Sequence, residues 1–110
     1  MRDAVKEIAE IKEREIRPIL NRVTEIVRGH LPEKSYRIML FGSWVTLESL
    51  STSDIDVAIL GDDPVHDLAM VRIREEIDRL PTLRKVDVVD LWTVEDRFRK
   101  NVMEHAETLE

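Results

Sequence analysis

Two aspartates near the middle of the chain have the type and spacing that metal chemistry requires. Asp54 and Asp56 stand two residues apart at the start of an apolar run, so their carboxylates share one face of an extended strand. Two like charges held this close repel each other unless something neutralises them, and hard oxygen ligands suit Mg²⁺. Asp54 and Asp56 are therefore candidate metal ligands.

Gly42 and Ser43 are separated from the first aspartate by ten residues and supply a complementary feature. Glycine lets a backbone approach phosphate closely, and Ser43 is expected to cap a short helix whose free N–H groups bind an anion. Metal-assisted phosphoryl or nucleotidyl transfer requires such a phosphate seat beside a metal-binding carboxylate pair. The alternative is a Gly-Ser turn with two surface aspartates on an edge strand. The joint pattern arises by chance in on the order of one such chain in a thousand, which favours the functional interpretation.

The spacing of Gly42-Ser43 and Asp54-x-Asp56 resembles the signature of the minimal nucleotidyltransferases. These are the small branch of the DNA polymerase β-like nucleotidyltransferase superfamily. The resemblance covers nearly the whole chain, from Pro18 onward. It implies an α/β (α+β) fold with a small mixed β-sheet flanked by helices. It also implies transfer of a nucleoside monophosphate from a nucleoside triphosphate, and a third carboxylate on a later strand.

Asp87 is the residue that matches the third carboxylate. It lies in the run 85–91, KVDVVDL, where it faces opposite to Val86 and Val88. The alternative for Asp87 is an exposed strand residue without a function. Asp90 has the opposite parity and is expected to be a strand-end or surface acid.

The resemblance implies a Mg²⁺-dependent reaction in which an acceptor hydroxyl attacks the α-phosphate of ATP in line and pyrophosphate leaves. Two Mg²⁺ ions would stabilise the attacking and leaving oxygens. Asp54 and Asp56 would hold both ions, and Asp87 would ligate the ion nearer the acceptor and help to deprotonate its hydroxyl. Gly42 and Ser43 would hold the β- and γ-phosphates. Catalysis would depend mostly on positioning and charge neutralisation, so no covalent enzyme intermediate is needed.

The segment after Gly42-Ser43 departs from the family pattern. Family members often carry basic residues and a glycine there, whereas this chain has Trp44-Val45-Thr46-Leu47. The missing charges would weaken triphosphate binding unless a partner supplies them, and the apolar turn is alternatively an interaction surface. Trp44 is expected to pack in the core or at an interface, with stacking on a base as the alternative.

Hydrophobic periodicity predicts the elements that position these residues. Helices are expected over residues 3–16, 18–29, 43–50, 64–80 and 94–108, and strands over residues 36–41, 54–60 and 85–91. Asp63 is expected to cap the fourth helix, and Thr93 to open a capping box for the last. His105 on that last helix is expected to be a packed or interface residue.

Length and composition limit the possible functions. The 110 residues suit one nucleotidyltransferase domain without a separate substrate domain: an N-terminal helical segment 1–30, a catalytic core 36–91 and a C-terminal helix 94–109. The net charge of −6 argues against strong direct binding of nucleic acid through a basic surface. Without cysteine there is no disulfide or Cys-based zinc site. No apolar run approaches a membrane span, so a cytoplasmic location is expected.

The resemblance, together with the small size, also implies a partner. Minimal nucleotidyltransferases are commonly paired with a small all-helical HEPN protein in a toxin–antitoxin module. The chain is therefore expected to be the antitoxin, adding AMP to a tyrosine of the HEPN toxin. Two alternatives are an adenylyltransferase that modifies a small molecule such as an aminoglycoside with a partner subunit, and a non-catalytic binding antitoxin. The intact carboxylate set argues against the latter, because clustered acids without a function destabilise a fold.

Overall fold

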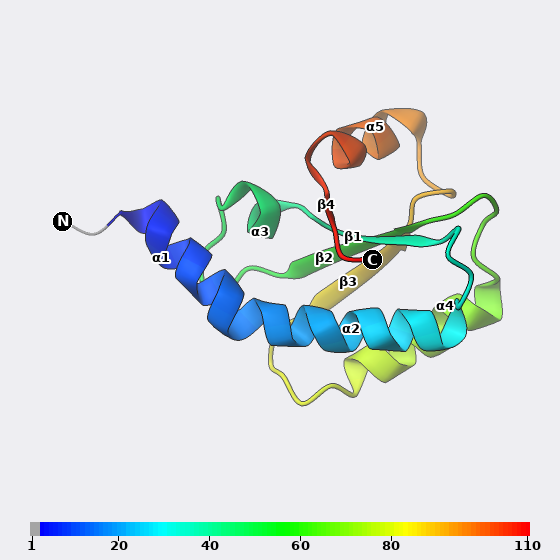
Figure 1. Cartoon of the computed structure of the whole chain (residues 1–110), viewed down its shortest axis with the longest axis horizontal. Coiled ribbons are helices and arrows are strands. Elements are labelled where there is room, and N and C mark those ends of the chain that lie inside the picture. Colours follow the sequence, from blue (N-terminus) through cyan, green and yellow to red (C-terminus); the bar gives the residue numbers. More distant parts are fainter. Residues whose placement is uncertain (1–2) are drawn as a thin grey trace.

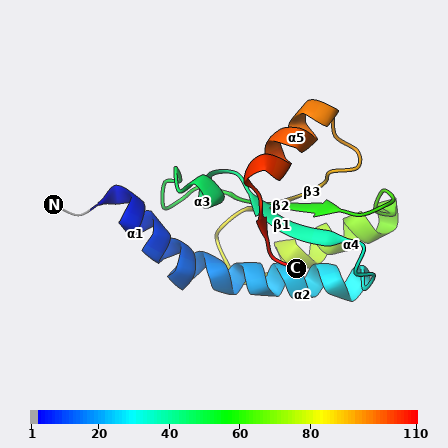
Figure 2. The same cartoon turned by 45° about the horizontal axis from the view of Figure 1, so that its top comes forward.

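A four-stranded sheet lies between two layers of helices in the computed structural model, which describes residues 3–110 (Figure 1, Figure 2). The elements in chain order are α1 (Ala4–Ile11), η1 (Lys12–Ile16), α2 (Arg17–His30), β1 (Arg37–Phe41), α3 (Ser43–Thr46), β2 (Ile55–Leu60), α4 (Asp67–Asp78), β3 (Val86–Asp90), α5 (Asp96–His105) and β4 (Glu107–Thr108). This architecture confirms the predicted α/β fold with a small mixed sheet flanked by helices. Across residues 3–110, no helix combines the length and apolar character needed to cross a membrane.

The strand order is β3-β2-β1-β4, and the sheet is mixed. β1 runs antiparallel to β2 and β4, whereas β2 and β3 run parallel. The end of β1 therefore meets the starts of β2 and β3 at one end of the sheet. At that end Phe41 pairs with Asp56, and Asp56 pairs with Asp87.

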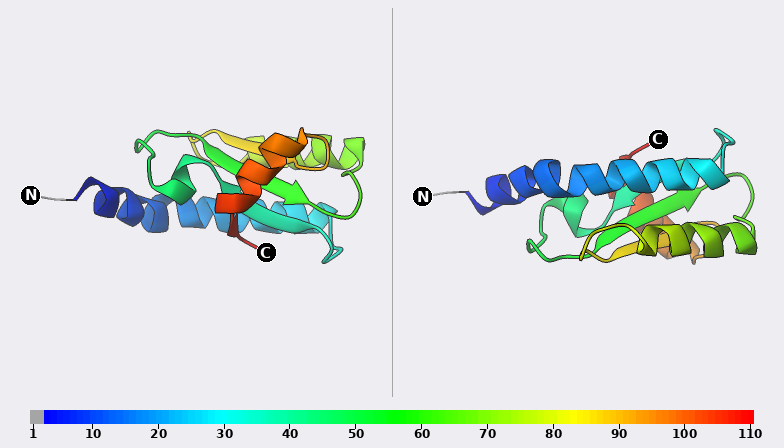
Figure 3. Two further views of the ribbon diagram at one scale, coloured as in Figure 1. Left: turned by 90° about the horizontal axis from the view of Figure 1, so that it is seen from above. Right: turned by 90° about the horizontal axis from the view of Figure 1, so that it is seen from below.

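Alternation along the strands divides the sheet into two apolar faces. One face packs against α2 and α4, which lie side by side beneath the sheet (Figure 3). Its central side chains are fully buried: Ile38, Leu40, Ile55, Val57 and Ile59. The opposite face carries Met39 and Ala58, which pack with Leu91 and with Val102 of α5. Asp56 shares the parity of Ala58 and therefore faces the side on which α5 lies.

The N-terminal helices form one bent rod instead of the two separate helices that were predicted (Figure 1). Pro18 lies in the first turn of α2, as predicted, and η1 before it is a π-helical turn. Proline lacks an N–H donor, and its ring crowds the carbonyl of the residue four positions earlier. The wider π-helical turn is a known way to accommodate such a break within a continuous helix.

Asp90 explains why α4 begins later than predicted. Its Oδ2 accepts a hydrogen bond of 2.8 Å from the backbone N–H of Val65. This contact fixes the segment before α4, so the cap is His66, whose Nδ1 accepts from the Leu68 N–H, and the predicted Asp63 cap was wrong. Asp90 ends β3, as expected of a strand-end acid, but it is buried instead of lying at the surface.

The start of the last helix was also predicted wrongly. The Thr93 hydroxyl donates to the Asp90 carbonyl oxygen, 2.9 Å away, so it forms no capping box. Glu95 occupies the N-cap of α5 without a side-chain hydrogen bond. The Thr93 side chain thus closes the turn after β3 instead of capping α5.

The C-terminal strand β4 was not predicted, because two residues are too few for a periodic signal. The last helix was predicted to run to residue 108, but it ends at His105 and residues 107–108 form this strand. Its first residue, Glu107, accepts hydrogen bonds from Lys12 at 2.8 Å and Arg17 at 2.7 Å. Burial alone would raise the pKa of Glu107, but the hydrogen bonds from Arg17 and Lys12 outweigh it and hold the pKa below its ordinary value. These ion pairs join the end of the chain to the long N-terminal helix.

We expect Glu107→Gln to lower the free energy of unfolding by roughly 1.5–3 kcal/mol at neutral pH, because two charge-assisted hydrogen bonds are lost. The stabilisation is present above the ordinary glutamate pKa of about 4.3 and disappears as the pH falls through the lower folded-state pKa. Denaturant unfolding from pH 7 to pH 3 measures this. Glu104→Gln, on an exposed part of α5, is the matched control. A constant difference across that pH range would contradict the charge-based explanation.

Candidate active site

Gly42 joins β1 to α3 in a conformation that favours glycine, with φ +79°. A Cβ added to this residue would lie 2.5 Å from Oδ2 of Asp56. The Gly42 backbone therefore lies directly against the Asp56 carboxylate. The predicted phosphate seat and the predicted metal ligand are neighbours in space.

Ser43 is the first residue of α3, and Gly42 occupies the N-cap without a side-chain hydrogen bond. The predicted Ser43 cap was wrong, and α3 ends at Thr46 because Leu47 is left-handed, with φ +60°. The Ser43 hydroxyl oxygen instead accepts a hydrogen bond of 2.8 Å from the hydroxyl of Ser49. With its oxygen already accepting, the Ser43 O–H can donate to a ligand. Ser49 is buried, and no sequence pattern had identified it.

The three predicted carboxylates lie at the same end of one sheet face. Asp56 and Asp87 are paired positions of the parallel strands β2 and β3, and Asp54 has the parity of Asp56 just before β2 begins. Burial, then the charge of Asp87, then that of Asp54 raise the pKa of Asp56 above its ordinary value. Asp54 and Asp87 are therefore both close enough to Asp56 to repel its carboxylate.

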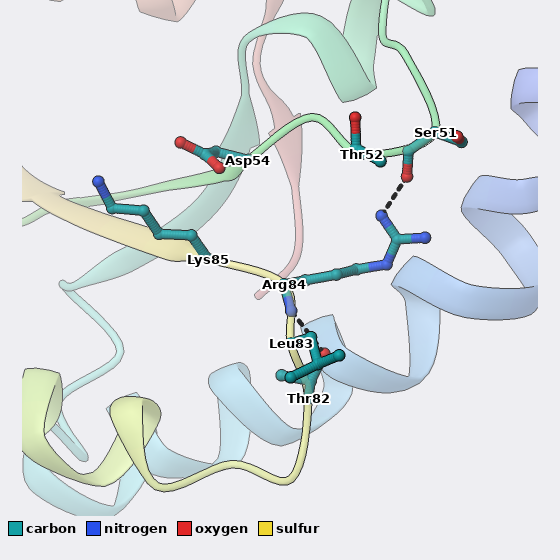
Figure 4. Close-up of a pocket in the computed structure, with 7 residues that line it drawn as sticks. All are labelled: Ser51, Thr52, Asp54, Thr82, Leu83, Arg84 and Lys85. Atoms are coloured by element: carbon teal, nitrogen blue, oxygen red, sulfur yellow. Dashed lines mark hydrogen bonds between the residues drawn. The ribbon is translucent and has the colours of Figure 1, made fainter.

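Lys85 is a basic residue within this acidic cluster that sequence reasoning missed. Its Nζ lies 3.7 Å from Oδ1 of Asp87, and its charge partly offsets the raised pKa of Asp56. Lys85 and Asp54 project to the same side at the sheet end (Figure 4). Its alternation with Asp87 along the chain, at the start of β3, was the available signal.

The carboxylates do not form a closed metal cage as they stand. In the part of the chain from residue 3 to residue 110, no three His, Asp or Glu side chains are gathered closely enough to hold a metal ion. Repulsion between like charges favours this open arrangement, and the Asp87 carboxylate has Lys85 as a neighbour, 3.7 Å away. The donor set still suits Mg²⁺, because every oxygen comes from a carboxylate and the residues share one face.

Trp44 packs in the core, as expected, and is fully buried. Its indole Nε1–H donates to the Ser53 carbonyl oxygen at 3.1 Å, and the Arg84 guanidinium lies 5.7 Å from the ring centroid. Arg84 also donates to the Ser51 carbonyl oxygen at 2.5 Å and to Glu15 at 2.9 Å. These contacts fix the loop that leads into the two aspartates.

Two hollows flank the carboxylates. One, of about 450 Å³, lies between residues 51–54 and residues 82–85 (Figure 4). The other, of about 260 Å³, lies between Gly42 and α5 and is lined by Phe41, Phe98 and His105 among others. His105 is exposed at this hollow, so it is not packed within this chain, and the alternative that it is an interface residue stays a prediction.

Comparison with known proteins identifies relatives of this site and fold. The family model "Polymerase beta, Nucleotidyltransferase" matches residues 15–109. The chain is 31% identical over 78 residues to the probable protein adenylyltransferase MntA of Haemophilus influenzae, covering 71% of this chain and 67% of that protein.

Solved structures with the same fold come from toxin–antitoxin complexes. A chain from a toxin–antitoxin crystal structure with AMP-PNP gives a TM-score of 0.65 at 25% identity, covering 83% of this chain and 72% of that one. A chain from the complex of tri-AMPylated Shewanella oneidensis HEPN toxin with MNT antitoxin gives a TM-score of 0.62 at 23% identity. That match covers 86% of this chain and 71% of the other, and it supports the fold alone.

We expect Asp56→Asn to raise the melting temperature of the metal-free protein at neutral pH, by about 4–8 °C for each kcal/mol of repulsion and burial cost that is relieved. A raised folded-state pKa means that ionising Asp56 costs more in the folded than in the unfolded protein. Below the ordinary aspartate pKa of about 3.9 the carboxyl is neutral in both states, so the gain should vanish. Thermal unfolding in EDTA from pH 8 to pH 3 tests this, with exposed Asp62→Asn as control. A melting temperature for Asp56→Asn below that of the wild-type protein would refute repulsion between the Asp56 carboxylate and its neighbours.

Proposed function

Because the chain belongs to the polymerase beta nucleotidyltransferase family, we propose that it transfers AMP from ATP to a hydroxyl group on a partner protein. The acceptor is a tyrosine of a small all-helical HEPN toxin, and the chain is the antitoxin of this pair in the cytoplasm. The observation that carries the proposal is the 31% identity with a probable protein adenylyltransferase. Two matched folds from toxin–antitoxin complexes are consistent with it.

The family in general uses a nucleotide substrate and a divalent metal. In our proposal Asp54 and Asp56 would hold two Mg²⁺ ions, and Asp87 would ligate the ion nearer the acceptor. When bound, Mg²⁺ neutralises charge on the triphosphate and acidifies the acceptor hydroxyl. The Gly42 backbone and the Ser43 hydroxyl hold the β- and γ-phosphates.

The residues of the chain divide the chemistry between two sides of the α-phosphate. Ser43 donates its O–H to the departing pyrophosphate, while Ser49 keeps the Ser43 oxygen occupied. Asp87 lies on β3, which β2 separates from β1 and Ser43. It accepts the proton of the attacking hydroxyl as the new O–P bond forms. AMP is then attached to the acceptor through a phosphodiester, and pyrophosphate leaves.

We expect Asp56→Asn and Asp87→Asn to reduce AMP transfer by roughly 10²–10³-fold or more, because each removes a charge aimed at the reacting centre. The assay incubates the protein with labelled ATP, Mg²⁺ and the helical protein encoded beside it, and measures label on that protein. Asp62→Asn, in the exposed turn after β2, should retain full activity. Unchanged transfer by Asp56→Asn would exclude its metal-binding role.

We expect Ser43→Ala to raise the KM for ATP by roughly 2–10-fold, the value of one hydrogen bond. Ser49→Ala should raise it in the same direction but less, because Ser49 only orients Ser43. Ser35→Ala, in an exposed turn, is the control. A raised KM for ATP in Ser49→Ala with an unchanged KM in Ser43→Ala would contradict the proposal that Ser49 acts through Ser43.

A further inference from the structure

The larger hollow lies on the β3 side of the carboxylates and has walls of mixed character. Asp54 and Lys85 form its inner end, next to the acidic cluster (Figure 4). Hydroxyl-bearing residues line the two flanking loops, among them Ser51, Thr52 and Thr82. Leu83 is a fully exposed leucine at its rim, with a relative exposure of 107%.

The order of the strands defines the direction from which an acceptor must come. Gly42 and Ser43 follow β1, Asp54 precedes β2 and Asp56 lies on it, and Asp87 lies on β3. In an in-line displacement the attacking and leaving oxygens lie on opposite sides of the phosphorus. If pyrophosphate leaves toward Gly42 and Ser43, then the attacking hydroxyl approaches from the β3 side.

Only one of the two hollows suits that direction. The smaller hollow includes Gly42 and therefore lies on the side of the departing pyrophosphate. The larger hollow ends at Asp54 and at Lys85, whose Nζ is 3.7 Å from Asp87. A side chain entering the larger hollow would thus bring its tip beside Lys85, which is the neighbour of Asp87, the group that takes the proton.

We propose that this larger hollow binds the segment of the partner protein that carries the acceptor hydroxyl, with its tyrosine ring against Leu83. The inference rests on the proposed function and adds the surface through which the partner is recognised. Leu83 provides the apolar contact that an aromatic ring requires, and the hydroxyls of Thr52 and Thr82 provide polar contacts around it.

The hollow is held in shape before any partner binds. Arg84 donates to the Ser51 carbonyl oxygen on one wall and its backbone N–H donates to the Thr82 hydroxyl on the other. The same guanidinium also bonds Glu15 and lies over the Trp44 ring. Walls fixed in this way reduce the ordering that binding would otherwise require.

The test measures AMP transfer at varied partner concentration, with the full chain, labelled ATP and Mg²⁺. We expect Leu83→Asp to raise the KM for the partner protein at least about fivefold, and Leu83→Ala to raise it less. Leu68→Asp is the matched control, because Leu68 is a 48% exposed leucine on α4, on the other face of the sheet. The affinity for ATP, measured by calorimetry, should be the same in all variants.

The outcomes separate the two levels of the proposal. A raised KM for the partner with unchanged ATP affinity supports the docking surface. Equal KM values for Leu83→Asp, Leu68→Asp and wild type would overturn it while leaving the transferase activity intact. Transfer to a small molecule with none to the partner protein would overturn both the docking surface and the acceptor. Absence of any transfer by the wild-type protein would overturn the proposed function itself.

Discussion

The pairing register of β1, β2 and β3 is the constraint on which the candidate site depends. It pairs Phe41, Asp56 and Asp87 across three adjacent strands and so places Gly42, directly after β1, against Asp56. Because side chains alternate, a slip of one residue would move the carboxylates to the opposite face. Burial prevents that slip, since Ile55 and Val57 are fully buried against the α2 and α4 layer. The apolar face of β2 therefore determines where its polar face presents the aspartates.

The charged groups that stabilise this fold lie apart from the carboxylates of the candidate active site. At the end of β1 the carboxylates repel one another, and the pKa of Asp56 is raised. Near the C-terminus the opposite arrangement holds: Glu107 lies between Lys12 and Arg17 and its pKa is lowered. The first cluster keeps an unfavourable charge density that a cation can relieve, whereas the second has all its charges paired. The large core beneath the sheet stabilises the fold that tolerates the first cluster.

Local patterns were sufficient to predict what local forces determine. The three longer strands, the Pro18 boundary and the common face of Asp54 and Asp56 all follow from alternation and proline stereochemistry. The failures involve contacts between residues distant in sequence. Asp90 fixes the Val65 backbone 25 residues away and delays α4, and β4 exists because it pairs with β1. Ser49 was also not identified, since a serine near the end of a predicted helix carries no sign of the hydroxyl that it orients.

The segment after Gly42-Ser43 supports the fold instead of supplying positive charge to the phosphate seat. The family pattern puts basic residues there, but this chain puts Trp44 there and buries it beneath Arg84. The Trp44 indole and Arg84 together fix the loop before Asp54, so the two aspartates follow a rigid segment. The phosphate seat, in turn, lacks the cationic side chains of the family pattern. Lys85 is a cation beside the carboxylates, but it lies directly before β3, on the side away from Gly42. Under the proposed function, the triphosphate would then be bound by backbone N–H groups, by Ser43 and by Mg²⁺. Lys85 remains on the side from which the acceptor arrives.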